Sequence, residues 1–217
     1  MNSLFFKEEH KMIKEMVRDF AITKIAPVAR ELDSKEIFPK ELVTEMGELG
    51  LMGVMVPEKY GGSGLDMTAF TTAIIELGKA DASVAITMAA HNSLGIMPLL
   101  LFGSEEQKKS YLPQLASGNT LGAFGLTEPD AGSDAASTKT KAVKSGDEYI
   151  VNGGKIFITN AGEAGFLSFT SQVIEDENSL GIGAFIIPTN TPGLEIGKKE
   201  KKWVGKQAIQ GKSILKI

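Results

Sequence analysis

The sequence predicts a multi-domain α and β protein, in which an all-helical domain over residues 1–118 precedes a small β-domain over residues 119–202. Two observations predict this order. Up to about residue 118, apolar residues recur with the period of amphipathic helices. From Leu121 onward, short strand-like runs alternate with turn residues, a pattern typical of a small barrel or sandwich.

Composition narrows the function classes. The chain has 217 residues, of which 42% are hydrophobic and 23% charged, as in an ordinary soluble globule. A net charge of −4 without a basic cluster excludes a nucleic-acid surface. The absence of cysteine removes disulfides and cysteine metal sites, and no other metal motif is found. Because the N-terminus resembles neither a secretory signal nor a transit peptide, we expect a cytoplasmic protein.

Four helices are predicted before the most apolar part of the domain ends. Met12, Met16 and Phe20 lie on one helical stripe, which ends or breaks near Pro27. Proline at a first helical turn marks the next start, at Pro39. The expected helices cover residues 8–22, 39–47 or 39–50, 67–79, and a kinked stretch over 82–102.

The stretch Ala82–Phe102 is near the 20 residues needed to cross a membrane. However, His91, Asn92 and Pro98 fall in its middle, where each would be costly in lipid. We therefore expect a helix buried inside a soluble protein, kinked near Gly95 to Pro98, with no membrane insertion. A lone histidine in an apolar helix is ordinarily a hydrogen-bonded core residue, so His91 is not a candidate site residue.

The helical domain ends on a capped helix. Ser104 and Gln107 have the spacing of a capping box, which predicts a short charged helix that gives way around Pro113. The β-domain follows after Gly118, with Asn152-Gly153 as its strongest hairpin signal. The expected strands cover 121–127, 138–144, 148–152, 155–160, 166–172 and 182–187.

The most informative stretch is Phe124 to Asp134, FGLTEPDAGSD, in which an apolar run breaks into a turn rich in hydroxyls and carboxylates. Pro129 favours an extended residue before it, and Gly132 allows close approach of the backbone. From turn chemistry alone, a plain polar hairpin turn is the ordinary interpretation.

This stretch resembles the flavin-binding signature of the acyl-CoA dehydrogenases. The stretches PEKYGGSGLD (57–66), HNSLG (91–95), GSEEQKKSYLPQLASG (103–118) and NGGKIFITNAG (152–162) match the same family in order and spacing. The resemblance covers about residues 1–202. It implies that the β-domain is a small barrel, here incomplete, and that the cofactor is FAD.

The resemblance also implies the site residues. The cofactor-binding candidates are Phe124, Gly125, Leu126, Thr127, Gly132, Ser133, Phe157, Ile158 and Thr159. Thr127 matches a threonine facing the pyrimidine end of the flavin, where a donor stabilises the charge of the reduced ring. Ser133 matches a serine near both FAD and the CoA arm, so it is also a substrate-binding candidate. Taken alone, Phe157-Ile158-Thr159 would be an ordinary core strand.

The family's reaction, part of fatty acid β-oxidation, converts an acyl-CoA thioester into a trans-2-enoyl-CoA and passes the electrons to an electron-transferring flavoprotein. Its glutamate base belongs to a C-terminal helical domain that is absent from these residues. We therefore expect no catalytic residue in this chain, and none of Glu128, Glu148 or Glu163 takes that role. The full-length family is expected to be tetrameric, and overall similarity to butyryl-CoA dehydrogenases suggests a short-chain substrate.

Two other interpretations stay open. In the first, the chain is a catalytically inactive remnant that at most binds flavin or acyl-CoA weakly. In the second, it is a β-barrel interaction module with a helical appendage. The missing base separates the enzyme from the remnant. Retention of flavin on purification separates both of these from the interaction module.

The resemblance stops abruptly after Lys202. Residues 203–217 differ from the family, yet codons exist for Lys202 to Ile217 that give KMGWQTSDTRKIN(F/L)ED when read one base out of phase. That peptide is like the family's own continuation. We interpret residues 203–217 as a non-native tail produced by a frameshift in the lysine run.

The first prediction concerns this frameshift. The chain as it stands is expected not to oxidise butyryl- to octanoyl-CoA with an artificial electron acceptor, whereas a frame-corrected gene is. Loss of a positioned general base alone removes roughly 100- to 10,000-fold in rate. Comparable turnover by both proteins at equal flavin loading would contradict it, and codons through the lysine run that cannot encode the family peptide would exclude the frameshift.

Overall fold

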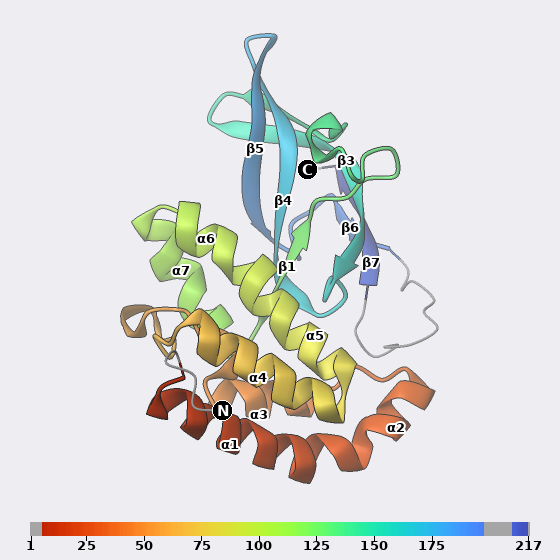
Figure 1. The fold of residues 1–217 in the computed structure, drawn as a ribbon. Helices are drawn as coiled ribbons and strands as arrows, with labels where there is room; N and C mark the ends of the chain where they lie inside the picture. The colour runs from red at the N-terminus through yellow and green to blue at the C-terminus, as the bar shows by residue number, and fades with distance from the viewer. Residues whose placement is uncertain (1–5, 198–209, 217) are drawn as a thin grey trace. The chain divides into compact units, whose positions relative to one another are not determined.

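The computed structural model describes residues 6–197 and the backbone of residues 210–216 (Figure 1). The chain divides into two compact units, of which the first ends at Thr120 and the second begins at Leu121. The first unit is helical and the second is built on a β-sheet. The predicted order of a helical domain and a β-domain is therefore confirmed.

The helical unit begins with a longer helix than predicted. The helix does not end near Pro27, but it is interrupted just before that residue by a π-helical turn, η1 (Ala21–Ile25), so the predicted break is present. The chain then continues as α2 (Ala26–Lys35), in which Pro27 takes a first-turn position where proline needs no amide proton. α1 and α4 pack along each other, and the buried carboxylate of Glu76 accepts a hydrogen bond from Arg18 Nε at 3.2 Å. The first elements are α1 (Glu8–Phe20), η1 (Ala21–Ile25), α2 (Ala26–Lys35), α3 (Lys40–Glu48), η2 (Leu51–Gly53), η3 (Glu58–Tyr60) and α4 (Met67–Ala80).

The apolar stretch Ala82–Phe102 forms α5 (Ala82–Ala90), a π-helical segment η4 (His91–Ile96) and α6 (Met97–Phe102). By length and composition alone it could cross a membrane, and half of its most apolar window is buried within the structure. The polar side chains in the middle of this stretch form hydrogen bonds with backbone groups of neighbouring elements. Asn92 Oδ1 accepts from the Val54 amide at 3.1 Å, and its Nδ2 donates to the Leu51 carbonyl at 2.9 Å.

His91 is fully buried, and its Nε2 donates to the Leu115 carbonyl at 3.0 Å. Burial lowers the pKa of His91 to about 4, although hydrogen bonds to the carbonyls of Leu115 and Met52 oppose the shift. His91 is thus a neutral core residue at pH 7, as its setting in the sequence predicted.

The last helix, α7 (Glu105–Ala116), starts at the predicted capping box. The Gln107 amide donates to Ser104 Oγ at 3.1 Å, and the Ser104 amide donates to Gln107 Oε1 at 2.9 Å. The helix does not give way around Pro113 but contains it and continues to Ala116. Leu112 and Leu115 are fully buried, so packing of this last turn outweighs the hydrogen bond that proline removes.

The sheet unit has seven strands in the order β1-β4-β2-β3-β7-β6, with β5 paired to β4. β1 and β2 each run parallel to β4, and β4 and β5 form a long antiparallel hairpin (Figure 1). In the described residues no ladder joins β5 to β6, so this described part of the sheet is open. The strands are β1 (Leu121–Gly125), β2 (Lys141–Ser145), β3 (Glu148–Thr159), β4 (Ala164–Glu175), β5 (Asn178–Pro188), β6 (Leu194–Ile196) and β7 (Gln210–Lys216).

One predicted hairpin is wrong. Asn152-Gly153 does not turn the chain; both residues lie inside the single long strand β3. Glycine is needed at position 153 for a different reason: a Cβ there would come within 2.3 Å of Thr140 Oγ1. The chain turns instead at Gly146, at Asn160 and at Asp176-Glu177, each of which lies between two consecutive strands and has a positive φ.

Part of the chain beyond Lys202 is described. Residues 203–209 and 217 of the proposed non-native tail lie outside the described residues. The backbone of residues 210–216 forms β7, which pairs antiparallel with both β3 and β6. The non-native origin of residues 203–217 stays a prediction.

The second prediction concerns His91. An imidazole with a folded pKa of about 4 takes up a proton more readily when the chain unfolds, so stability is complete above pH 6.5 and falls as pH drops toward 4. The expected loss is ~1.4 kcal/mol per pH unit in that window. Nuclear magnetic resonance of the imidazole measures the pKa directly, with a His10→Gln variant to assign the only other histidine. A midpoint near 6.5 in the folded protein would contradict the prediction.

Candidate functional site

The two segments that carry the predicted site residues lie side by side in the sheet unit. The end of β1 leads into residues 126–128, and β3 passes beside them. The Ile156 amide donates to the Thr127 carbonyl at 2.8 Å. Gly125 is buried where a Cβ would come within 3.0 Å of the Lys155 side chain. A glycine here lets β3 approach the end of β1 closely.

An apolar surface is exposed where these segments meet. Leu126 is 40% exposed and Phe157 is 57% exposed. Phe157 lies on a β-bulge, where Ile156 and Phe157 stand opposite one position of β7. Its φ of 57° is in the left-handed region, which is strained for a bulky side chain. Strain combined with an exposed aromatic side chain is characteristic of a ligand-binding position.

Hydrogen-bonding groups border this surface. Thr127 is half-buried, and among the described residues neither its amide nor its hydroxyl has a hydrogen-bond partner. The following turn is closed by two backbone bonds between Glu128 and Ala131, at 2.9 and 3.2 Å. Gly132 and Ser133 come next and are exposed, and open space surrounds Gly132. The segment therefore presents donors suited to an anionic or carbonyl-bearing ligand.

The other predicted residues differ in how far their side chains are exposed to a ligand. Phe124 and Thr159 are half-buried. Ile158 is fully buried in the hydrophobic core of the sheet unit, so only its backbone is available to a ligand. The structure thus brings all the predicted residues onto two adjoining segments, but the exposed side chains among them are those of Leu126, Phe157 and Ser133.

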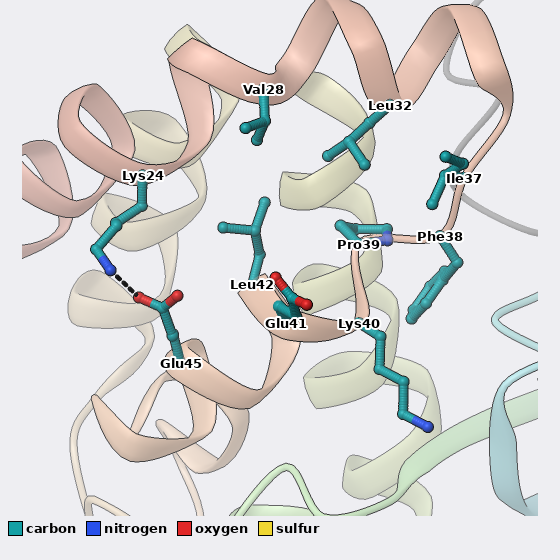
Figure 2. A pocket seen from close by; sticks show the side chains of 10 residues that line it. All are labelled: Lys24, Val28, Leu32, Ile37, Phe38, Pro39, Lys40, Glu41, Leu42 and Glu45. Atoms are coloured by element: carbon teal, nitrogen blue, oxygen red, sulfur yellow. Dashed lines mark ion pairs between the residues drawn. The ribbon is translucent and has the colours of Figure 1, made fainter.

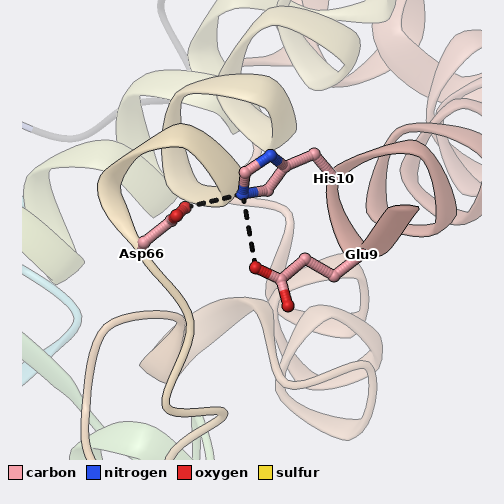
Figure 3. A group of neighbouring side chains, drawn as sticks. All are labelled: Glu9, His10 and Asp66. Carbon is pink, nitrogen blue, oxygen red and sulfur yellow. Dashed lines mark hydrogen bonds and ion pairs between the residues drawn. The ribbon is translucent and has the colours of Figure 1, made fainter. Parts of the chain in front are cut away.

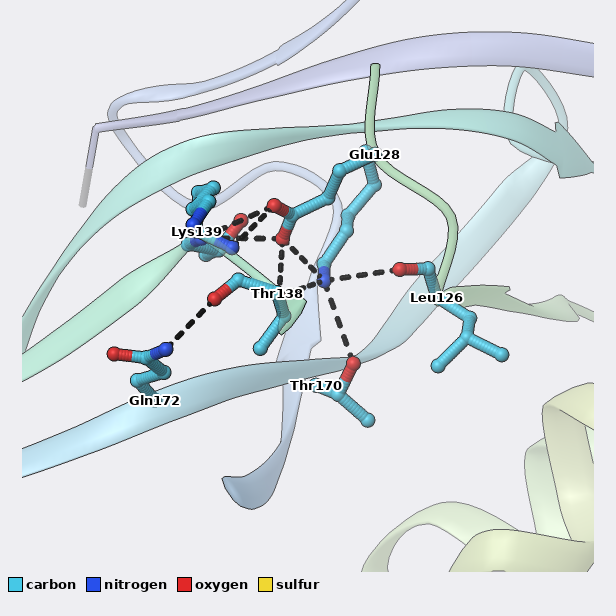
Figure 4. A network of polar contacts seen from close by, with 8 residues as sticks. Leu126, Glu128, Thr138, Lys139, Thr170 and Gln172 are labelled. Carbon is cyan, nitrogen blue, oxygen red and sulfur yellow. Dashed lines mark hydrogen bonds and ion pairs between the residues drawn. The ribbon is translucent and has the colours of Figure 1, made fainter. Parts of the chain in front are cut away.

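Directly beneath these segments is a buried ion pair that the sequence analysis missed. Lys155 Nζ lies 2.7 Å from Glu128 Oε1, and the side chains are 0% and 3% exposed (Figure 4). The Glu128 carboxylate also accepts from the Thr138 hydroxyl and from the amides of Lys139 at 2.5 Å and Thr140 at 3.1 Å. The signal in the sequence was that Lys155 lies four positions after Val151, and so, in one continuous strand, on the face that Val151 buries.

The electrostatics exclude Glu128 as a base. Burial alone would raise the pKa of Glu128, but hydrogen bonds from Lys155, Thr138, Thr140 and Lys139 lower it to about 2. Burial also lowers the pKa of Lys155, an effect that the Glu128 carboxylate opposes. A carboxylate so well satisfied is a weak proton acceptor.

A second cluster, Glu9, His10 and Asp66 in the helical unit, has the residue types of a metal site (Figure 3). His10 Nδ1 accepts from the Lys7 amide at 3.0 Å, so Nε2 carries the proton and donates to Asp66 Oδ1 at 2.9 Å. The Lys7 ammonium already lies 3.2 Å from Glu9 and 3.9 Å from Asp66. With Asp66 capping α4, the cluster ties together the starts of two helices.

A cavity of about 490 Å³ lies between α2 and α3 in the helical unit (Figure 2). Val28 and Leu32 on α2 lie opposite Leu42 on α3, and the ion pair between Lys24 and Glu45, at 2.9 Å, lies at one end. Its lining is mainly apolar. It contains none of the predicted site residues.

Comparison with known families now identifies the fold. The N-terminal domain of the acyl-CoA dehydrogenases matches residues 7–119, and the middle domain of the same family matches residues 123–216. The chain belongs to the acyl-CoA dehydrogenase family. The resemblance inferred from the sequence motifs is thereby confirmed.

An acyl-CoA dehydrogenase of Bacillus subtilis is 48% identical over 195 residues, which are 90% of this chain and 52% of that protein. The chain spans about half the length of the curated relatives it matches.

Solved structures show the same fold. Butyryl-CoA dehydrogenase from Megasphaera elsdenii superposes with a TM-score of 0.91 at 40% identity, over 99% of this chain and 57% of that one. An acyl-CoA dehydrogenase complexed with FAD from Bacillus anthracis gives 0.91 at 37% identity, over 100% and 37%. A chain from a structure of the electron transferring flavoprotein of Acidaminococcus fermentans gives 0.93 at 42% identity, over 99% and 56%.

The third prediction concerns Glu128. Because its folded pKa lies below the ordinary value of 4.5, its contribution to stability is complete above pH 4.5 and is lost as pH falls toward 2. In Glu128→Gln this contribution is absent. The difference in free energy of unfolding between wild type and variant should therefore shrink below pH 4.5, by ~1.4 kcal/mol per pH unit. Chemical denaturation at a series of pH values measures it, and a constant difference from pH 6 to pH 3 would contradict the buried charge.

Proposed function

We propose that this chain carries the flavin-binding part of an FAD-dependent acyl-CoA dehydrogenase, an oxidoreductase that converts an acyl-CoA thioester to a trans-2-enoyl-CoA. One observation carries the proposal. Two segments that match the family's flavin motifs, 124–133 and 157–159, are joined by the bond from the Ile156 amide to the Thr127 carbonyl. Together they expose Phe157 and Leu126 beside the amide and hydroxyl of Thr127, which have no hydrogen-bond partner in the part of the chain that the structure describes.

The residues present fit FAD. The exposed side chains of Phe157 and Leu126 offer an apolar face to a flat, largely apolar ring system. Thr127 would donate to the pyrimidine end of the ring from its amide and hydroxyl. Gly132 and Ser133 are both exposed, and a Cβ on Gly132 would have open space around it. They would donate to phosphate oxygens, and Ser133 would also contact the CoA arm. When bound, FAD accepts the hydride that leaves the β-carbon of the substrate.

This chain would bind and orient rather than abstract the proton. Glu128 is held ionised and buried by its four partners, so it does not act as the base. Glu148 and Glu163 are exposed and belong to neither flavin segment. The proton-abstracting base, and the residues that cover the rest of the flavin ring, would belong to the segment that the relatives have and this chain does not span.

Substrate and partners follow from the same family setting. We propose a short acyl chain, which is supported by the likeness to butyryl-CoA dehydrogenase. An electron-transferring flavoprotein as electron acceptor is supported by the likeness to a chain from the Acidaminococcus structure. A homotetramer and a cytoplasmic location belong to the same proposal.

Titration of FAD into the protein tests the proposal, both for the chain as it stands and with the reading frame restored. Quenching of flavin fluorescence with saturation at one FAD per chain is the expected result. A protein that folds in both forms, as judged by a cooperative melt, yet binds no FAD in either would contradict it.

The fourth prediction uses the strain at Phe157. Phe157→Gly should change the free energy of unfolding by less than about 0.5 kcal/mol, because relief of the left-handed backbone, worth about 1 kcal/mol, offsets the flexibility of glycine. The same change should weaken FAD binding about tenfold through loss of the aromatic face. Ile150→Gly is the matched control, since Ile150 lies on the same strand and is 50% exposed.

In ordinary strand backbone, Ile150→Gly should destabilise the protein by roughly 0.5–1 kcal/mol and leave FAD affinity unchanged. Equal losses of stability in the two variants would show that Phe157 is not strained. Equal FAD affinity in wild type and Phe157→Gly would show that its ring does not meet the flavin.

A further inference from the structure

The buried ion pair beneath the flavin segments connects parts of the chain that no ladder joins within the described residues. Lys155 Nζ has four oxygen neighbours: the Leu126 carbonyl at 3.1 Å, Glu128 Oε1 at 2.7 Å, Thr138 Oγ1 at 3.0 Å and Thr170 Oγ1 at 3.3 Å (Figure 4). These belong to the turn after β1, the segment before β2, and β4. One ammonium on β3 therefore contacts three other parts of the unit.

Glu128 completes the connection from the opposite side. Its carboxylate accepts the backbone amides of Lys139 and Thr140 in addition to the Lys155 ammonium. Thr138 in turn accepts from Gln172 of β4 through its carbonyl, at 2.9 Å. Charge-assisted hydrogen bonds thus fix residues 126–128 and 138–140, which lie outside the strands, to each other and to β3, and a neutral hydrogen bond links residue 138 to β4.

The position of Lys155 in sequence gives these contacts a direct consequence. Its neighbour Ile156 makes the backbone bond to Thr127, and the next residue is the strained Phe157. The ammonium reaches the carbonyl of Leu126, the residue immediately before Thr127. Two contacts from adjacent residues of β3 therefore hold adjacent residues of the flavin segment, Leu126 and Thr127.

We infer that Lys155 is a positioning residue for the flavin: with Glu128 it sets the placement of Leu126 and Thr127 relative to Phe157. This rests on the proposed function. Lys155 is fully buried, so it does not touch the ligand and acts through the backbone of its neighbours. A merely stabilising pair is the competing explanation. Replacing a buried pair by neutral groups often costs little stability, so the two explanations predict different results for a double variant.

The experiment compares three variants of the full chain with wild type. Lys155→Met keeps an unbranched side chain, one atom shorter than lysine, but leaves the Glu128 charge unpaired. Glu128→Gln with Lys155→Met removes both charges. Lys144→Met is the matched control. It deletes the ion pair between Lys144 and Glu175 in the same unit, but Lys144 lies on β2 and its side chain is 46% exposed.

The first measurement needs no flavin. Hydrogen exchange of the Ile156 amide reports its bond to the Thr127 carbonyl. We expect exchange at least about tenfold faster in the Lys155→Met single and double variants, because loss of hydrogen bonds to a charged group is worth at least a factor of ten. The amide of Val143 in β2 serves as an internal reference, and Lys144→Met should leave Ile156 protection unchanged.

The second measurement is the FAD dissociation constant. We expect the double variant to melt within a few degrees of wild type and well above Lys155→Met, yet to bind FAD about tenfold more weakly than wild type. A double variant that melts like wild type and binds FAD like wild type would overturn the inference, as would faster Ile156 exchange without weaker FAD binding.

Two further results keep the tests separate. If wild type binds no FAD, the proposed function fails, and unchanged Ile156 exchange in the variants would independently overturn the positioning role. If neither Lys155 variant folds, Thr170→Val removes a single acceptor of the ammonium without changing side-chain shape. It should then weaken FAD binding about two- to threefold, and an unchanged dissociation constant would overturn the inference.

Discussion

The sheet unit depends on one buried ion pair, between Glu128 and Lys155. Bringing two charges out of water costs several kcal/mol per ion in proteins, and their attraction offsets this only when the remaining hydrogen-bonding groups are satisfied. Here the carboxylate receives the Lys155 ammonium, the Thr138 hydroxyl and two backbone amides. The pair therefore stabilises one arrangement of the surrounding backbone, because any other arrangement would strand a charge. Residues 126–128 and 138–140 lie outside the strands, and these hydrogen bonds fix their backbone as ladder hydrogen bonds fix a strand.

The helical unit buries polar groups by a different route. His91 and Asn92 are neutral and bond to backbone carbonyls and an amide of neighbouring elements. They hold the loop after α3 and the end of α7 against the apolar helix Ala82–Phe102. In the sheet unit, by contrast, the side chain that accepts the amides of Lys139 and Thr140 is the charged Glu128, and the Lys155 ammonium balances its charge.

Local signals in the sequence predicted the elements whose causes are local. The apolar period gave most of the helices, and the Ser104–Gln107 spacing gave the start of α7. Pro113, Asn152-Gly153 and Lys155 were misjudged or missed because each is explained by a contact with distant residues. Gly153 makes room for Thr140, and Lys155 meets Glu128 across 27 positions of sequence. For the site, family resemblance supplied the identities of the residues. It did not supply that Ile158 belongs to the core or that Phe157 lies on a bulge with a left-handed backbone.

These features explain each other when taken together. An exposed phenylalanine in a strained conformation and an exposed leucine beside it lower the stability of an isolated domain. A flexible backbone would relieve both, by letting Phe157 turn inward or the bulge shift along β3. The bond from Lys155 to the Leu126 carbonyl and the bond from Ile156 to the Thr127 carbonyl oppose such a shift from adjacent positions. A rigid ligand such as a flavin gains affinity when its binding surface is already in place, since less ordering remains to be done on binding. The buried ion pair therefore stabilises the backbone of residues 126–127 and 157 in the conformation that exposes Phe157 and Leu126, and it does so without a bound ligand.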